Sequence, residues 1–387
     1  MAALPAGRPR ALVTNACSDP GLVTLRELAR AGYTVLGAEH RRLPLGLHSR
    51  HAAQMVCLPP PDHPDYDAAL LAAVERHRPE VFLPLGSLET AAACRLAGPL
   101  AALTHCLIPP AAAFTLAFDK GRCHAQCRLL GIPVPTTYTR DEAEALLRPG
   151  GSDTVLIVKP STDVGNGQGL ALVRTPADLE RAIAHCRERH GAHLIEEFIP
   201  GGAEGMRLAL LLFDRRSRLA AAFTSRKLRH WPPRGGRTVV SRSTHDHELV
   251  ELVRPWFERC GWVGPAEAEC KFDPRDGRLK LIEINPRPVA YLRFAARCGI
   301  NFPLLTARLA REPDFRPVAD LGYPPDAAYV RPLLFLRSAL HDPRHAMRDA
   351  RGLLALGADL LSDPGPLAGH LLAIAQRKWR KKSHPAH

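Results

Sequence analysis

The first hundred residues alternate short apolar runs with amphipathic segments, and this alternation constrains the fold more than any other feature of the chain. Apolar runs at 10–14, 33–37 and 81–85 have the length of strands, and their spacers at 22–31 and 67–77 show helical periodicity. Short strands that alternate with helices predict an α/β fold with a parallel sheet covered by helices on both faces. The G-x-G-x-x-G fingerprint is absent after the first strand, so we do not expect an NAD site there.

The composition is that of a globular chain, with 46% hydrophobic and 24% charged residues. Prolines interrupt the longest uncharged run, 96–118, and no signal-peptide pattern opens the sequence, so we expect a cytoplasmic protein without a membrane partner. A net charge of +13 would permit binding to nucleic acid. Because the basic residues are scattered, apart from the run at 377–382, we expect no nucleic-acid partner.

Lysine is scarce, and Lys159 stands at the end of the apolar run 154–159, where a charge is costly unless an anionic group meets it. Three glycines alternate in the loop that follows, namely Gly165, Gly167 and Gly169. Such a loop lets backbone N–H groups approach a phosphate closely. The pattern G-x-x-x-x-G-K-[ST] is absent, so this is not a Walker loop. A hairpin loop without a ligand is the alternative interpretation.

A predicted hairpin over 266–285 carries the sharpest polar pattern. Strand alternation places one set of polar side chains on a single face, namely Glu267, Glu269, Lys271, Glu283 and Asn285. If Asp273 faces Leu279 across the turn, Glu269 faces Glu283. Two carboxylates opposite each other repel and call for a cation, and oxygen ligands of this kind suit Mg²⁺. The alternative is a solvent-facing hairpin that Lys271 neutralises.

Four motifs follow one another in an order that resembles the ATP-grasp superfamily. They are Asp119-Lys120, Val158-Lys159-Pro160 with its glycine loop, the stretch 194–201 that contains Glu196-Glu197-Phe198-Ile199, and the stretch 281–287 that contains Glu283-Ile-Asn285-Pro-Arg287. The chain more closely resembles the bacterial carboxylate-amine ligases of the carbamoyl phosphate synthase-like branch, and the stretch 226–236 resembles one group of them. The resemblance covers about residues 10 to 310.

This resemblance implies an α/β ATP-grasp fold in four parts. A Rossmann-like pre-ATP-grasp domain would occupy 1–112, and the small lid subdomain of the ATP-grasp unit would occupy 113–195. The large subdomain with the metal site would occupy 196–312, followed by a short, mostly helical C-terminal region over 313–387.

The resemblance also implies roles for the matching residues. The nucleotide would contact Lys120, Lys159, the glycine loop, Glu196, Glu197, Phe198, Ile199 and Glu204. The metal, Mg²⁺ with Mn²⁺ as the alternative, would be held by Glu269, Glu283 and Asn285. Arg287 would stabilise the transferring phosphoryl group, and Lys227 and Arg229 would hold a substrate carboxylate or the acyl phosphate. A plain surface role is the alternative for Lys227 and Arg229. Cys270 departs from the group, which usually has a bulky aromatic residue at this position.

The function that the resemblance implies is an ATP-dependent ligase that joins a small-molecule carboxylate to an amine through an acyl phosphate. Such chemistry needs alignment and charge neutralisation rather than covalent help from the protein. The alternatives are another acyl phosphate enzyme, carboxylase-like or purine-pathway-like, and an ATP-binding subunit without catalytic activity. A homodimer is a common arrangement in the superfamily.

Overall fold

The computed structural model describes the residues 7–40, 49–148, 154–162, 169–231, 236–317, 322–339, 363 and 365. The chain divides into two compact units, each built from separate stretches of sequence. The first comprises Met1–Ile108, Arg287–Arg316 and Ala350–His387, and the second comprises Pro109–Pro286 and Pro317–Asp349. The four-part division expected from the sequence, with boundaries near 112, 195 and 312, stays a prediction.

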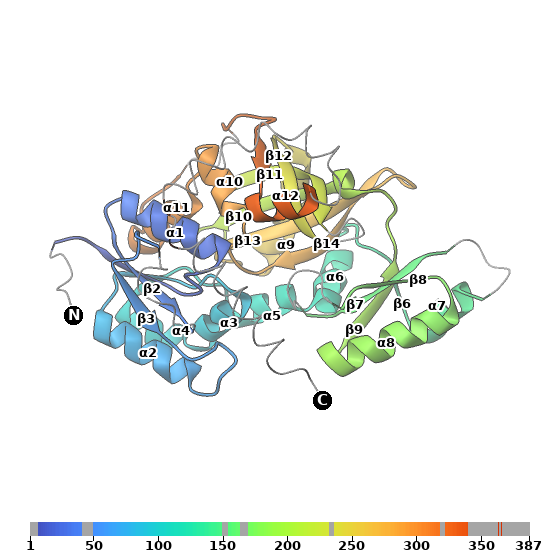
Figure 1. Cartoon of the computed structure of the whole chain (residues 1–387), viewed down its shortest axis with the longest axis horizontal. Coiled ribbons are helices and arrows are strands. Elements are labelled where there is room, and N and C mark those ends of the chain that lie inside the picture. Colours follow the sequence, from blue (N-terminus) through green and yellow to red (C-terminus); the bar gives the residue numbers. More distant parts are fainter. Residues whose placement is uncertain are drawn as a thin grey trace. The chain divides into compact units, whose positions relative to one another are not determined.

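The first unit contains a sheet of five parallel strands in the order β3-β2-β1-β4-β5 (Figure 1). Its strands are β1 (Arg10–Val13), β2 (Thr34–Glu39), β3 (Gln54–Cys57), β4 (Val81–Leu83) and β5 (His105–Cys106). The connecting helices are α1 (Asp19–Arg30), α2 (Tyr66–His77), α3 (Ser87–Arg95) and α4 (Ala97–Leu103). The predicted parallel α/β sheet is therefore confirmed. Two helices from later in the chain, α10 (Leu292–Arg297) and α11 (Phe302–Arg311), complete the unit, and α11 packs on α1, β4 and β5.

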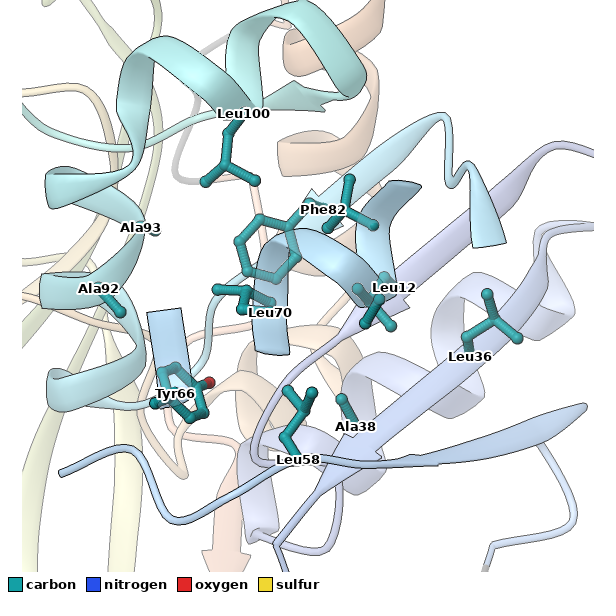
Figure 2. Close-up of a cluster of buried hydrophobic side chains, with 12 residues drawn as sticks. Leu12, Leu36, Ala38, Leu58, Tyr66, Leu70, Phe82, Ala92, Ala93 and Leu100 are labelled. Atoms are coloured by element: carbon teal, nitrogen blue, oxygen red, sulfur yellow. The ribbon is translucent and has the colours of Figure 1, made fainter. Parts of the chain in front are cut away.

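One side of this sheet is closed by an apolar core, which Figure 2 shows. The ring of Phe82 from β4 lies at its centre, between Leu70 of α2 and Leu100 of α4. Leu12 of β1 extends the cluster along the sheet. Because α2, α3 and α4 all contribute side chains, this core fixes these helices against the strands. In sheets of this kind, ligands bind beyond the carboxyl ends of the strands.

The second unit contains a six-stranded antiparallel sheet in the order β14-β13-β10-β11-β12-β15. Its strands are β10 (Met206–Phe213), β11 (Leu219–Trp231), β12 (Arg237–Thr244), β13 (Gly264–Asp273), β14 (Arg278–Asn285) and β15 (Ala328–Val330). Four described helices pack on it. Helix α9 (His247–Arg259) contacts β10 and β11, α12 (Pro332–Ala339) contacts β12, and the pair α5 (Ala111–Phe118) and α6 (Lys120–Leu129) contacts β14.

A smaller antiparallel sheet in the order β6-β9-β7-β8 belongs to the same unit. It consists of β6 (Thr137–Tyr138), β7 (Leu156–Pro160), β8 (Ala171–Val173) and β9 (His193–Glu197), with the helices α7 (Arg140–Leu146) and α8 (Pro176–His190). Helix α7 begins with a capping box between Thr139 and Glu142, and Thr175 caps α8. Buried side chains of α8 and of β7 and β9 form the core beneath this sheet, namely Leu179, Ile183, Leu156, Val158 and Ile195.

The expected C-terminal helical region is described only in part. Helix α12 lies within it, whereas 340–362 and 366–387, including the basic run at 377–382, lie outside the described residues. Within the part of the chain that the structure describes, no helix combines the length and the hydropathy needed to cross a membrane.

Candidate active site

The β13–β14 hairpin brings the predicted metal-binding residues onto one face. Glu269 pairs directly with Glu283, and Glu267 pairs with Asn285. The predicted pairing of the two carboxylates is therefore confirmed. The turn register behind it was wrong by one residue, because Asp273 pairs with Arg278. The register then shifts between Glu269 and Cys270: Cys270 pairs with Leu281, and Glu269 pairs with Glu283 rather than with Ile282. This irregularity offsets the error at the turn and gives the predicted pairing.

Two lysines from other elements neutralise this carboxylate pair. Lys227 of β11 places its Nζ 2.7 Å from Glu269 Oε2, and Lys120 of α6 places its Nζ 3.3 Å from Glu283 Oε2. Burial would lower the pKa of Lys227, but the carboxylates of Glu269, Glu267 and Glu283 outweigh it and raise that pKa. Lys227 is therefore a cation at neutral pH, held inside an acidic cluster.

Asn285 completes the polar face of the hairpin. Its Nδ2 donates a hydrogen bond of 3.0 Å to Glu267 Oε2, and both side chains are buried. The bond fixes the orientation of the amide. Among the described residues, no three His, Cys, Asp or Glu side chains gather into a metal-binding group. The donor set is instead two carboxylates and one amide, whose oxygens suit a hard cation such as Mg²⁺ when nucleotide phosphates complete its shell.

A buried cluster of three polar side chains joins the small sheet to α6. Lys159 of β7 places its Nζ 2.7 Å from Glu196 Oε2 of β9, and His124 Nδ1 of α6 lies 3.1 Å from Glu196 Oε1. Less than a tenth of each side chain is exposed. Burial would raise the pKa of Glu196, but Lys159 and His124 outweigh it and hold that pKa below its usual value. The opposite ring nitrogen, His124 Nε2, lies 3.0 Å from the carbonyl oxygen of Ile282 in β14.

The glycine loop is described only at its end. Gly165 and Gly167 lie outside the described residues. Gly169 has φ +75°, and a Cβ there would approach His190 Cδ2 to 2.5 Å and Pro160 Cγ to 2.8 Å. Backbone conformation and close packing therefore both require glycine at 169. Its role in a phosphate cradle stays a prediction.

The segment 196–199, which includes the end of β9, is predicted to hold adenine, and the side chain of Glu197 has partners of its own. Both carboxylate oxygens of Glu197 are bound: Oε1 lies 2.9 Å from Lys280 Nζ, and Oε2 lies 2.6 Å from Arg275 Nη2. The backbone N–H of Thr136 also donates to Oε1, at 3.0 Å. The Glu197 carboxylate thus ties the small sheet to the β13–β14 turn, which leaves only backbone groups of Glu197 for a nucleotide.

Lys271 holds the next part of this segment. Its Nζ donates to the carbonyl oxygens of Ile199, at 2.7 Å, and Gly201, at 3.1 Å, and lies 5.0 Å from the centre of the Phe198 ring. Lys271 therefore pairs with neither Glu269 nor Glu283, whose partners are Lys227 and Lys120, and this part of the alternative interpretation is wrong. Glu204, in the short 3₁₀ helix η2 (Ala203–Gly205), accepts a bond of 3.2 Å from the N–H of Gly202.

The remaining predicted residues lie on two units. Arg229 of β11 places its guanidinium carbon 5.3 Å from the ring centre of Phe335 in α12. Arg287 begins the later part of the first unit, where its Nε donates to Ser87 Oγ at 2.9 Å. Burial raises the pKa of Glu89 in the first turn of α3, and Arg287 counteracts this shift. The roles expected for Arg229 and Arg287 stay predictions.

Sequence reasoning missed His124 and the partners of Lys271. A histidine on the buried face of a helix is commonly a core residue, so its type alone gave no signal. The signal that could have found it is spacing: His124 follows Lys120 by four residues and therefore shares its helix face.

Part of the chain is similar in sequence to a known protein. No protein-family model matches the chain. A D-aspartate ligase of Enterococcus faecium (strain Aus0004) is 27% identical over 110 residues, which are 28% of this chain and 26% of that protein. The chain therefore matches about a quarter of that relative's length.

Two solved structures extend the likeness over most of the chain. The biotin carboxylase domain of Hydrogenobacter thermophilus 2-oxoglutarate carboxylase, in complex with MgADP, ADP and bicarbonate, has a TM-score of 0.65 at 16% identity and covers 82% of this chain and 73% of its own. An L-amino acid ligase from Bacillus licheniformis has a TM-score of 0.56 at 17% identity and covers 79% and 74%. The fold that the motifs predict is confirmed: the chain has the ATP-grasp fold that these two structures share.

Proposed function

We propose that this chain is an ATP-dependent carboxylate-amine ligase, which activates a small carboxylate as an acyl phosphate and joins it to an amine. One observation carries the proposal: on an ATP-grasp fold, Glu269 and Glu283 face each other and each is paired with a lysine. An arrangement of this kind provides alignment and charge neutralisation, which are the main requirements of phosphoryl transfer.

The nucleotide half of the site would use the small sheet and α6. Lys120 and Lys159 would contact the phosphates, as would the glycine loop 165–169. The backbone of 196–199 would hold adenine, and Glu204 would contact the ribose. Each of these lysines is paired with a carboxylate. A polyanionic ligand could replace that carboxylate as partner, which supports this assignment.

Glu269, Glu283 and Asn285 would hold Mg²⁺, or Mn²⁺, by their oxygens. When bound, the metal would neutralise charge on the phosphates. Lys227 and Arg229 would hold the substrate carboxylate or the acyl phosphate, and Arg287 would stabilise the phosphoryl group in transfer. The site would have to exclude water, because an acyl phosphate hydrolyses readily in water.

The relatives support ligation over other acyl phosphate chemistry in one respect. The sequence match is to a protein described as a D-aspartate ligase, and an L-amino acid ligase is among the similar structures. We therefore propose a small carboxylate and an amine, each the size of an amino acid, as substrates. A carboxylase-like reaction is the second candidate, because a biotin carboxylase domain gives a TM-score of 0.65, against 0.56 for the ligase.

The test is ADP release from Mg-ATP by the purified chain with pooled amino acids, other small carboxylic acids and amines, and separately with bicarbonate. Arg287→Ala is the control, and products are weighed by mass spectrometry. ADP formed only with one acid and one amine, and a product lighter than their sum by one water, would establish ligation. ADP release that requires bicarbonate would favour the second candidate. Failure to bind ATP would refute the proposal, and binding without turnover in any pool would favour a non-catalytic ATP-binding subunit.

A further inference from the structure

His124 lies where α6 contacts β14, the strand that carries Glu283. Lys120 and His124 are four residues apart on this helix and share one face. Lys120 Nζ lies 3.3 Å from Glu283, and His124 Nε2 lies 3.0 Å from the carbonyl oxygen of Ile282, the preceding residue of β14. Helix α6 therefore contacts β14 through polar groups at two consecutive residues.

The other edge of the same ring faces the small sheet. His124 Nδ1 lies 3.1 Å from Glu196 Oε1, while the second oxygen of Glu196 holds Lys159 at 2.7 Å. Within the described ranges of the chain, neither His124 Nδ1 nor Glu196 Oε1 has a hydrogen-bond partner, so the pair with Lys159 is the stronger of the two. Glu196 thus divides its interactions between a strand lysine and a helix histidine.

Burial makes this arrangement informative. The side chains of His124 and Glu196 are at most 1% exposed, and an apolar residue would fill the position of His124 without any cost of burying polar atoms. The ring nitrogens instead face a carbonyl oxygen and a carboxylate oxygen, which are acceptors on two different sheets. One buried side chain therefore contacts both the residue next to Glu283 and the partner of Lys159.

We propose that His124 is a positioning residue, which couples the lysine assigned to the nucleotide phosphates to the strand assigned to the metal. This inference rests on the proposed function. His124 acts through its neighbours: the contact with Ile282 fixes the backbone that carries Glu283. The contact with Glu196 keeps that carboxylate from turning wholly towards Lys159, which leaves Lys159 able to meet an anionic ligand.

Two near-isosteric substitutions separate the two contacts. In His124→Gln, the longer side chain places an amide N–H near the position of Nε2, so donation to Ile282 is kept and the contact with Glu196 is lost. In His124→Asn, the shorter amide reaches the position of Nδ1, so the contact with Glu196 is kept and donation to Ile282 is lost. The probes are a non-hydrolysable ATP analogue, measured by calorimetry at saturating Mg²⁺, and the Mg²⁺ concentration that gives half-maximal binding of that analogue.

We expect His124→Gln to weaken binding of the analogue about three- to tenfold, with the half-maximal Mg²⁺ concentration unchanged. We expect His124→Asn to raise the half-maximal Mg²⁺ concentration by a similar factor, with the affinity at saturating Mg²⁺ unchanged. His185→Gln, on the exposed side of α8, is the matched control and should leave both values unchanged.

Three results would overturn the coupling. Wild-type values in both variants would show that neither contact acts on the ligand. Equal losses in both variants, in step with a lower melting temperature, would show that His124 serves packing alone. Absence of analogue binding to the wild-type protein would refute the proposed function itself. The wild type and the His185→Gln control are therefore measured before any His124 variant.

Discussion

Glu269 and Glu283 stand opposite each other across the β13–β14 ladder, yet each holds a lysine from a different element, Lys227 and Lys120. Like charges paired across a ladder repel, and the two lysines offset this repulsion between the carboxylates. A divalent cation held by Glu269 and Glu283 would supply the neutralising charge in place of the lysines. We expect both lysine side chains then to become available to phosphate or carboxylate groups of the substrates.

The first prediction concerns Glu283. Its side chain is 29% exposed, so its pair with Lys120 contributes at most about 1 kcal/mol to stability. We expect Glu283→Gln to keep the melting temperature of the wild type and to abolish turnover of Mg-ATP, because the metal loses a charged ligand. Thermal unfolding and ADP release measure the two effects. Unchanged turnover in a folded variant would exclude Glu283 as a metal ligand.

The second prediction concerns Lys159. Removing one partner of a buried pair leaves an uncompensated charge, which costs about 3–5 kcal/mol, and here His124 remains beside Glu196 to offset part of it. We therefore expect Lys159→Ala to lower stability and also to weaken ATP binding by about 1.5–3 kcal/mol, the contribution of a charge-assisted contact. Calorimetry, at a temperature where unfolding experiments show the variant folded, measures the binding term. An unaltered ATP affinity would argue against a phosphate contact by Lys159.

Local patterns in the sequence predicted the parts of the fold that depend on neighbouring residues. The βα alternation gave the parallel sheet, and the period of two gave the shared face of Glu269 and Glu283. The bulge that corrected the register between Glu269 and Cys270 has no signature in one sequence. The order of the six-stranded sheet is equally unreadable, because β13 pairs with β10 and β15 with β12, across long stretches of chain.

Residue types in the sequence indicate the candidate site residues, but they do not indicate the partners that the structure gives them. Lys227 was expected to hold a substrate carboxylate, and the structure pairs it with Glu269, 42 residues away. His124 contacts the carbonyl of Ile282 across 158 residues, and Lys271 contacts that of Ile199 across 72. Contacts of such long range depend on the packing of whole elements, so no local periodicity indicates them.

The third prediction concerns pH. Hydrogen bonds from Arg275, and then from Lys280, hold the pKa of buried Asp273 far below its usual range. In the unfolded chain this pKa is about 3.9, so the stabilisation is complete above about pH 4 and is lost as the pH falls towards the folded value. We expect the free energy of unfolding to fall as the pH drops below about 4, and Asp273→Asn to flatten this dependence.

Urea unfolding at a series of pH values measures this effect. At pH 6 we expect Asp273→Asn to cost about 1.5–3 kcal/mol, the contribution of hydrogen bonds to a charged group. The control is Asp141→Asn, at an exposed position in the first turn of α7, which should keep the wild-type slope. Equal slopes in wild type and Asp273→Asn would show that Asp273 does not carry the pH dependence.

The last prediction concerns Lys271, which donates to the carbonyl oxygens of Ile199 and Gly201 and lies over the ring of Phe198. Burial lowers the pKa of Lys271, and Glu204 and Asp273 counteract this, so the ammonium pays a desolvation cost that its two carbonyl contacts offset. If the segment 196–199 binds adenine, Lys271→Met should loosen that segment and raise the KM for ATP about three- to tenfold, the effect of one or two hydrogen bonds, with kcat unchanged. Lys271→Arg, which keeps a donor, should restore part of the affinity. Arg278→Met, at the exposed first residue of β14, should match the wild type. A fall in kcat without a change in KM would place Lys271 at the reacting groups, and wild-type kinetics would show that its contacts do not reach the nucleotide.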